Sequence, residues 1–421
     1  MTPIFRSKWL QSARMLLLLP PLLLTACGGG PAKSGTATPT ATASSSAMPT
    51  ESAEATPVPS APDASPSETP PASETASPPS AGEPTPMAQV TALRLIDFQS
   101  GWAGGIGWIA RTDDGGKSWQ LQYEGDGEAH QLFALNGQQA WATLNTDDPK
   151  RYPLLRTSDG GEHWEAAGDV PNGGFLHFVS DREAFSAHTR TTDGGKTWTS
   201  LPVPDGIVGD AYYRDSRSGW AVTQSKGQFH FVHTSDGGKT WIKTMTRAWD
   251  GEITGTTIRS TGKNDAWIQL NGGHGMTQQS YSLFHTSDGG QKWKTVVANG
   301  TAGGGPAPGF KANEKDLPTN AGNSPGTLYV ASPSVAFLSG QCQACDKSNT
   351  MGHTTDGGGT WINGKDEFAG YGTPLVAAVD AKHVWWIVTD AAEASVMYAS
   401  SDGGAHWTKA HTFEKPRPAE K

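Results

Sequence analysis

Short apolar runs alternate with clusters of Gly, Asp, Asn and Ser from Gln89 to Glu414. Residues 93–98, 176–179 and 375–379 are examples of these runs. Nothing in this region shows the 3.6-residue period of a helix, whereas short runs bounded by turn-forming residues are typical of β-strands. The pattern predicts an all-β fold.

Two further features recur seven times each. The first is a small or branched residue followed by an aromatic one, at Trp102, Trp141, Phe185, Trp220, Trp267, Phe337 and Trp385. The second is a phrase of Ser or Thr, any residue, Asp, two or three glycines, and a tryptophan five residues after the aspartate. Its aspartates are Asp114, Asp159, Asp193, Asp236, Asp288, Asp356 and Asp402, and its tryptophans are Trp119, Trp164, Trp198, Trp241, Trp293, Trp361 and Trp407.

Seven recurrences predict seven structural units. Each unit has room for an apolar strand A, an aromatic strand B, a strand C that ends in the Asp phrase, and a strand D that begins at its tryptophan. Some 325 residues over seven units gives about 46 per unit, close to a propeller repeat of about 40–50. We therefore expect residues 89–414 to form a seven-bladed β-propeller of four-stranded blades, followed by a tail at 415–421.

The Asp phrase has the composition of a turn. An aspartate carboxylate can accept backbone N–H bonds two residues further on, and glycines supply positive φ angles. The tryptophan is expected to insert between neighbouring sheets, a burial worth about 2–3 kcal/mol. The seven aspartates are therefore predicted to be structural. A calcium loop would need further acidic residues where this phrase has glycines.

The phrase resembles the Asp-box, also called the bacterial neuraminidase repeat. Together with the apolar and aromatic strands, it makes essentially all of residues 89–414 similar to the photosystem II stability/assembly factor family. That resemblance implies an Asp-box propeller that acts as a chaperone-like scaffold for a membrane complex, with no catalytic residue and no cofactor.

The N-terminus resembles a bacterial lipoprotein signal peptide, predicted at residues 1–26. A basic start precedes the apolar run 15–24, which is shorter than the about 20 residues of a membrane span and is broken by two prolines. Residues 24–28 resemble a lipobox, which implies lipidation of Cys27. Two acyl chains give stable anchoring, so we expect an extracytoplasmic protein that is lipid-anchored to the bacterial cell membrane. Ordinary cleavage beside an incidental cysteine is the alternative.

Residues 27–88 are rich in Pro, Ser, Thr and Ala. Such a segment cannot bury enough apolar surface to offset its chain entropy, so it is predicted to be a disordered linker, either a spacer or a solubilising segment. The chain has a formal net charge of −9. An acidic protein lacks the basic surface that sequence-independent nucleic-acid binding requires.

Loop lengths predict where a partner binds. In a propeller the D–A and B–C connections share one face, and the A–B and C–D turns share the other. The connection lengths vary on the first face, and the longest contains residues 299–325. Function usually lies where loops vary over a rigid scaffold, so His274, Phe310 and Lys311 are the predicted partner face. The alternative is that this insertion is disordered and binds nothing.

Cys342 and Cys345 lie in the predicted B–C hairpin of the sixth unit. Outside the cytoplasm a local disulfide is expected. Asp346 follows the second cysteine, whereas c-type haem attachment requires His there. A structural metal site would need four ligands, and only His353 lies near in the sequence.

Three classes of function are open. The favoured one is a monomeric, non-enzymatic scaffold for a protein partner. A lectin-like protein that binds cell-wall glycan would use Tyr152, Tyr212, Tyr213 or Trp249. A glycosidase would need two carboxylates about 5–9 Å apart, for which Glu128, Asp205, Asp210, Asp250 and Glu252 are the candidates. The Arg-Ile-Pro motif of sialidases is absent. We expect no catalytic residue, no metal and no cofactor.

Overall fold

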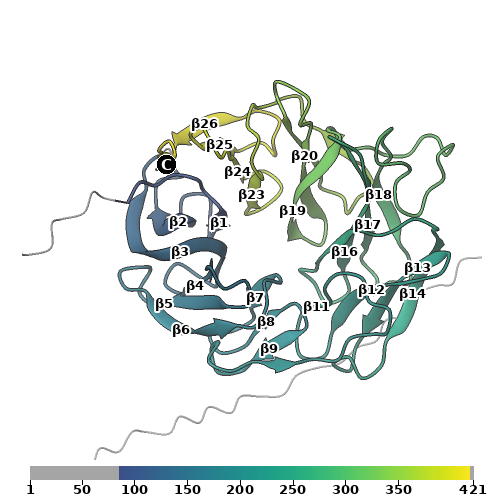
Figure 1. The fold of residues 1–421 in the computed structure, drawn as a ribbon, viewed down its shortest axis with the longest axis horizontal. Coiled ribbons are helices and arrows are strands. Elements are labelled where there is room, and N and C mark those ends of the chain that lie inside the picture. Colours follow the sequence, from purple (N-terminus) through teal and green to yellow (C-terminus); the bar gives the residue numbers. More distant parts are fainter. Residues whose placement is uncertain (1–84, 418–421) are drawn as a thin grey trace, which may run out of the picture. The chain divides into compact units, whose positions relative to one another are not determined.

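The computed structural model describes residues 85–417. The predicted signal peptide, Cys27 and most of the predicted linker lie outside the described residues, as does the end of the tail. The described part of the chain is all-β, with 26 strands that form six sheets. The sheets are arranged as a propeller around a central axis (Figure 1). The all-β propeller prediction is thus confirmed.

The first sheet has six strands in sequence order. They are β1 (Ala92–Leu95), β2 (Gly101–Thr112), β3 (Gln120–Ala134), β4 (Ala140–Asn145), β5 (Tyr152–Thr157) and β6 (Glu165–Val170). β2 pairs with β1 through residues 101–104 and with β3 through residues 106–111. β3 pairs with β2 as far as Glu128, and from Glu128 onward it pairs with β4.

Each of the other five sheets has four antiparallel strands. The second contains β7 (Leu176–Phe178), β8 (Ala184–Ser186), β9 (Thr189–Thr191) and β10 (Thr199–Ser200). The third contains β11 (Tyr212–Tyr213), β12 (Gly219–Ser225), β13 (Gln228–Thr234) and β14 (Ile242–Ala248). The fourth contains β15 (Gly255–Arg259), β16 (Ala266–His274), β17 (Gln279–Thr286) and β18 (Lys294–Asn299). The fifth contains β19 (Ser324–Ser332), β20 (Val335–Gln341), β21 (Asn349–Thr354) and β22 (Ile362–Asn363). The sixth contains β23 (Leu375–Ala378), β24 (Val384–Val388), β25 (Val396–Ser400) and β26 (Thr408–Thr412).

The prediction of seven blades was wrong, because the described strands make six hydrogen-bonded sheets. β2 covers both strand B and strand C of the first expected unit. β3 covers strand D of that unit and strand A of the next, and no proline interrupts it. Two expected units therefore share one sheet, and seven Asp phrases are distributed over six sheets.

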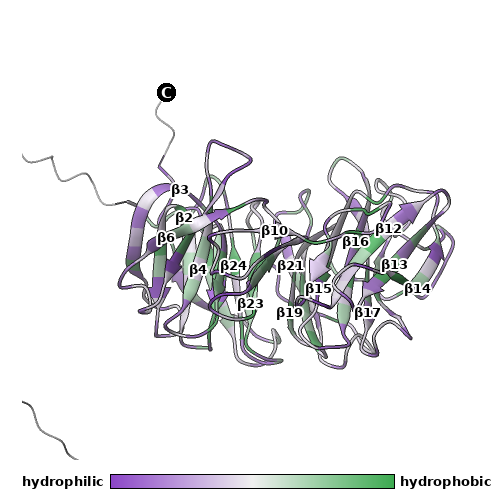
Figure 2. Ribbon diagram, turned by 90° about the horizontal axis from the view of Figure 1, so that it is seen from below, coloured by the Kyte–Doolittle hydropathy of each residue, from purple (hydrophilic) through white to green (hydrophobic). Residues whose placement is uncertain are grey.

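The aromatic residues at the strand B positions of the seven expected units lie in the core. Trp102, Trp141, Phe185, Trp220, Trp267, Phe337 and Trp385 are all at most 1% exposed. Of the seven phrase tryptophans only Trp119 is buried, and the other six are half-buried. Figure 2 shows apolar residues along the strands, whereas most residues of the outer strands β6 and β14 are exposed or half-buried. The strand B aromatics therefore contribute more buried surface than the phrase tryptophans.

The first and last sheets close the ring. Ala88 forms a parallel bridge with Glu414, and the Trp108 indole donates to the Ala88 carbonyl at 2.9 Å. The Trp119 ring packs edge-on against Trp385 at 6.2 Å. Closure therefore combines one short backbone bridge with aromatic packing between residues distant in the sequence.

The Asp phrases form seven turns with one hydrogen-bond pattern, which we call the Asp-Gly-Gly turns. In the turn at Asp236, the Thr234 hydroxyl donates to the carboxylate at 2.8 Å and accepts from the Gly238 N–H at 2.9 Å. The carboxylate also accepts from the Thr240 N–H at 2.9 Å. The donor is four residues after the aspartate, rather than two as the sequence suggested.

The two glycines after each aspartate have different surroundings. Both adopt positive φ, as expected, at 74° for Gly289 and 87° for Gly290. The N–H of the first glycine donates to the A–B turn of the same unit, as from Gly289 to the Asn264 carbonyl at 2.8 Å. The same bond recurs in all seven turns. In the turn at Asp288 the second glycine faces the preceding sheet, where a Cβ on Gly290 would lie 2.6 Å from the Thr244 Cβ.

This difference predicts unequal effects of alanine at the two positions. A Cβ on Gly289 would have no atom within 4 Å, so G289A should cost only the strain of positive φ, about 1 kcal/mol. G290A carries the same strain and also overpacks the inter-sheet contact, which adds about 1–3 kcal/mol. Urea unfolding of the two variants measures the difference. Equal destabilisation would contradict the assigned contact.

The Asp-Gly-Gly turns also predict an acid dependence of stability. Hydrogen bonds from Thr240 lower the pKa of Asp236 to about 2, below the usual value of about 3.9. The unfolded chain therefore takes up a proton at a higher pH than the folded one. The stabilisation is present above about pH 4 and is lost as the pH falls towards 2.

The T240V variant lacks the hydroxyl that donates to Asp236, so the pKa of Asp236 in the folded protein should move back towards its usual range. The variant should therefore lose less stability than wild type between about pH 5 and pH 3. T408V is the matched control, an exposed threonine at the start of β26. Urea unfolding at the two pH values gives the comparison. An unchanged acid dependence in T240V would refute the role of this hydroxyl.

Candidate functional site

The structure places the predicted partner residues in two different environments. His274 and Lys311 are exposed. Phe310 is only 6% exposed, stacks on Phe284 with ring centroids 5.9 Å apart, and lies 4.5 Å from the Arg247 guanidinium. The prediction that Phe310 contacts a partner was therefore wrong, because its ring is part of the core.

The insertion between β18 and β19 is ordered, contrary to the alternative of disordered filler. Asn299 and Asn320 are joined by two hydrogen bonds of 2.8 Å, one in each direction. Arg247 donates to the Gly309 carbonyl at 3.1 Å. The insertion is therefore anchored to the third and fourth sheets.

Four connections on this face form one continuous surface, which we call the rim: residues 275–278, 300–323, 342–348 and 364–373. The first and second are joined by the Gly303 N–H and Gln278 side chain at 3.0 Å. Backbone bonds continue from Asn323 to the β20 end, where Gln341 donates to the Gly372 carbonyl at 2.8 Å.

Two exposed apolar side chains lie on the rim. Met276 is 100% exposed and Tyr371 is 64% exposed. In the third rim segment Cys342 and Cys345 form a disulfide with a Cα–Cα distance of 5.4 Å. The rim is thus a fixed surface with apolar residues directed to solvent.

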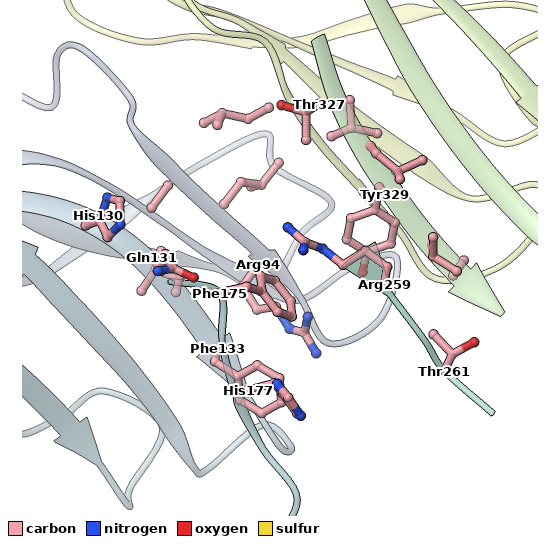
Figure 3. A pocket seen from close by; sticks show the side chains of 18 of the residues that line it. Arg94, His130, Gln131, Phe133, Phe175, His177, Arg259, Thr261, Thr327 and Tyr329 are labelled. Atoms are coloured by element: carbon pink, nitrogen blue, oxygen red, sulfur yellow. The ribbon is translucent and has the colours of Figure 1, made fainter. Parts of the chain in front are cut away.

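A second candidate site is the central cavity, which sequence reasoning missed. Its volume is about 580 Å³, within the range of ligand pockets. It is lined from the innermost strand of every sheet, with both β1 and β3 contributing from the first. Arg94, Phe133, Phe175, His177 and Arg259 are directed into it (Figure 3). No sequence motif joins these residues, so only the closed ring reveals them.

Burial changes the titration of two groups in this cavity. It lowers the pKa of His177 to about 4, with a smaller contribution from the Arg259 charge. Burial also raises the pKa of Tyr212 to about 12, and its hydroxyl donates to the Ser260 carbonyl at 2.9 Å. At neutral pH both groups are therefore uncharged.

The candidate carboxylates of a glycosidase do not line the central cavity. Asp205, Asp250 and Glu252 are exposed, and Glu128 is half-buried on β3. Asp210 lines a smaller adjoining cavity of about 160 Å³. The larger cavity has no Asp or Glu among its described lining residues, so these contain no pair of carboxylates for glycoside hydrolysis.

The aromatic residues proposed for glycan binding are mostly internal. Tyr213 is fully buried and donates to the Pro202 carbonyl, while Tyr212 is 8% exposed. Trp249 packs against the core of the third and fourth sheets, and Tyr152 lies against His130 at 5.6 Å. These four rings therefore do not form an open platform for a sugar.

One group of metal-type ligands occurs within residues 85–417, at Asp159, Glu162 and His163. Asp159 already accepts from the His163 backbone at 3.0 Å and its ring at 2.8 Å, as part of an Asp-Gly-Gly turn. This group therefore has a structural explanation. In the same range, no helix has the length and apolar character needed to cross a membrane.

No family model matches the chain. Over 78 residues it is 33% identical to vacuolar protein sorting/targeting protein 10 of Sordaria macrospora, a match that covers 16% of this chain and 5% of that protein. The chain thus spans a small part of that relative's length.

Solved structures are similar to this chain at low sequence identity. YCF48 bound to D1 peptide matches with a TM-score of 0.43 and 16% identity, covering 76% of this chain and 92% of YCF48. A prolyl endopeptidase matches with a TM-score of 0.49 and 8% identity, covering 79% of this chain and 51% of that chain. None of these similarities assigns the chain to a family.

The buried imidazole in the central cavity predicts a pH effect that H177F should remove. Below about pH 6.5 the unfolded chain binds a proton on His177, whereas the folded protein does so only near pH 4. Wild type should therefore lose roughly 2 kcal/mol more than H177F between pH 7 and pH 5. Urea unfolding at both pH values tests this. Identical losses would show that His177 is not buried in the neutral form.

Proposed function

We propose that this protein is a non-enzymatic scaffold that binds a protein partner through the rim. We further propose that a lipid on Cys27 holds it at the outer side of the bacterial cell membrane, with residues 27–88 as the linker. The observation that carries the proposal is the fully exposed Met276 on a rim that is otherwise ordered by hydrogen bonds.

The exposed apolar residues of the rim have the character of an interface. Methionine and tyrosine are enriched in protein–protein interfaces, where lysine and glutamate are depleted. The Met276 side chain is fully exposed. A partner that covers it would remove its apolar surface from water, which favours binding. Because the surrounding segments are already ordered, binding would require little loss of chain entropy.

Carbohydrate binding is the second candidate, and the 64% exposed ring of Tyr371 favours it. A sugar ring could stack on this side chain. However, the four aromatic residues that the sequence offered for this role are largely buried or packed against neighbours. A protein partner would contact both Met276 and Tyr371. A protein-binding role therefore explains two exposed side chains of the rim, whereas stacking of a sugar explains only Tyr371.

Affinity capture with full-length protein from crosslinked membrane fractions tests the proposal. The M276S/Y371S variant removes the two apolar side chains of the rim and should lose most of a partner that wild type captures. I242S/I362S is the matched control, because it removes side chains of 64% and 47% exposure that follow two Asp-Gly-Gly turns.

The two double variants distinguish the outcomes. If both capture the same proteins as wild type, the rim is not the partner site. If M276S/Y371S instead loses binding to isolated cell-wall glycan while protein capture is unchanged, the carbohydrate alternative replaces the scaffold.

A further inference from the structure

The central cavity is positively charged, although the chain as a whole has a formal net charge of −9. Arg94 and Arg259 supply the positive charge among its described lining residues, which include no Asp or Glu. A cationic cavity in an acidic protein is unlike the average of its surface. Such a site attracts anions, because low-dielectric walls strengthen the field of the guanidinium groups.

Neither cavity arginine has an acidic partner in the described part of the chain. None of the ion pairs found there contains Arg94 or Arg259. Arg259 donates to the Ile258 carbonyl at 2.9 Å, and Arg94 reaches the Ala134 carbonyl only at 3.5 Å. The Arg94 Nε is buried without a hydrogen-bond partner. Since a guanidinium has five N–H donors, most of the donors of Arg94 and Arg259 have no acceptor in the described part of the chain.

Phenyl rings hold both guanidinium groups in place. The Arg259 group lies 3.7 Å from the Phe175 ring centroid, and the Arg94 group lies 4.5 Å from that of Phe133. Stacking uses the flat face of a guanidinium and leaves its edge, which carries the donors, free to bind. The two cations are thus positioned before any ligand arrives.

His177 is a third group without a partner. It is 8% exposed, it lines the cavity, and neither ring nitrogen has a hydrogen-bond partner. Its ring is stacked on Tyr212 with centroids 5.1 Å apart. A buried polar group without a partner is destabilising. Both ring nitrogens are inaccessible to solvent, so His177 contributes to the packed wall of the cavity rather than a contact for the ligand.

We propose that the central cavity binds a small organic carboxylate, with the charged group at Arg94 and Arg259 and an apolar body against the surrounding rings. The carboxylate is planar and accepts two parallel N–H bonds from one guanidinium edge. This inference is independent of the proposed scaffold function, because the rim and the cavity use different residues.

The rest of the lining favours an apolar body over a bare anion. Phe133, Phe175 and Tyr329 present aromatic surface, and Leu93 and Leu132 present aliphatic surface. A volume of about 580 Å³ exceeds what a carboxylate group alone would fill. Inorganic phosphate would satisfy the charges without using this apolar surface.

Isothermal titration of the full chain with 3-phenylpropanoate and its amide tests the site. The acid and amide have the same shape, so their difference isolates the charge. A ligand of this size is expected to bind with a millimolar dissociation constant, and the amide about tenfold or more weaker. R94Q and R259Q should each weaken acid binding by a similar factor.

R151Q is the matched control, because Arg151 is an exposed arginine paired with Asp169. It should leave binding unchanged. R259K retains a charge without the planar edge and should weaken binding less than R259Q. The melting temperature of each variant shows whether it has folded, and R94Q provides a second test should R259Q fail to fold.

Three results would overturn the proposal. They are equal binding of acid and amide, unchanged binding in both R94Q and R259Q, and the absence of any binding at millimolar acid. If inorganic phosphate binds as tightly as the acid, the site is a general anion site and the assigned apolar body is wrong. A peptide with a free C-terminus and its amidated form are compared in the same way. If only the free form binds more tightly than 3-phenylpropanoate, the carboxylate is that of a peptide C-terminus.

Discussion

The hydrogen bond from each Asp-Gly-Gly turn to its A–B turn is the interaction on which the propeller depends. The first glycine donates to a carbonyl of the turn that joins the two inner strands, and this occurs in all seven turns. The second glycine lies against the preceding sheet in four of the turns, as Gly358 does beside Val296. One short phrase therefore fixes two turns of one unit and, in those four turns, also contacts the neighbouring sheet. The opposite face has no such constraint, which leaves its connections free to differ in length.

Ring closure then creates the central cavity as a consequence of packing. Strands that are distant in the sequence converge there, and Arg259 at the end of β15 reaches Phe175, which precedes β7. Tyr212 on β11, in the intervening third sheet, has its ring centroid 6.3 Å from that of Phe175. The charge of Arg259 is retained at neutral pH, although burial lowers its pKa to about 10. The cavity therefore keeps a partly desolvated cation without an ion-pair partner among the described residues.

Sequence patterns correctly predicted the features that depend on contacts within one unit. They failed for the features that depend on contacts between residues distant in the sequence. The phrase around Asp236 and the aromatic of strand B at Trp220 predicted turns and core correctly, because each depends on neighbours within one unit. The number of sheets was wrong, because β3 continues from one unit into the next without a residue that stops its pairing. Phe310 was misplaced because its neighbours Gly309 and Lys311 suggest a loop, whereas its ring fills the core beside Phe284. The cavity residues carry no shared motif, so they could not be grouped from the sequence.

Variable loops identified the rim but were a poor guide to the cavity. Arg94 and Arg259 lie at or next to strand ends that lead into A–B turns, on the side of the constant turns. The expectation that function avoids this side followed from comparing loops, which detects only sites built from loops. A binding site built from the inner strands can change its specificity through single side-chain substitutions on those strands. It therefore does not require loops of different length. Because the rim lies at the opposite strand ends, the proposed ligand in the cavity and the proposed protein on the rim would not compete for the same residues.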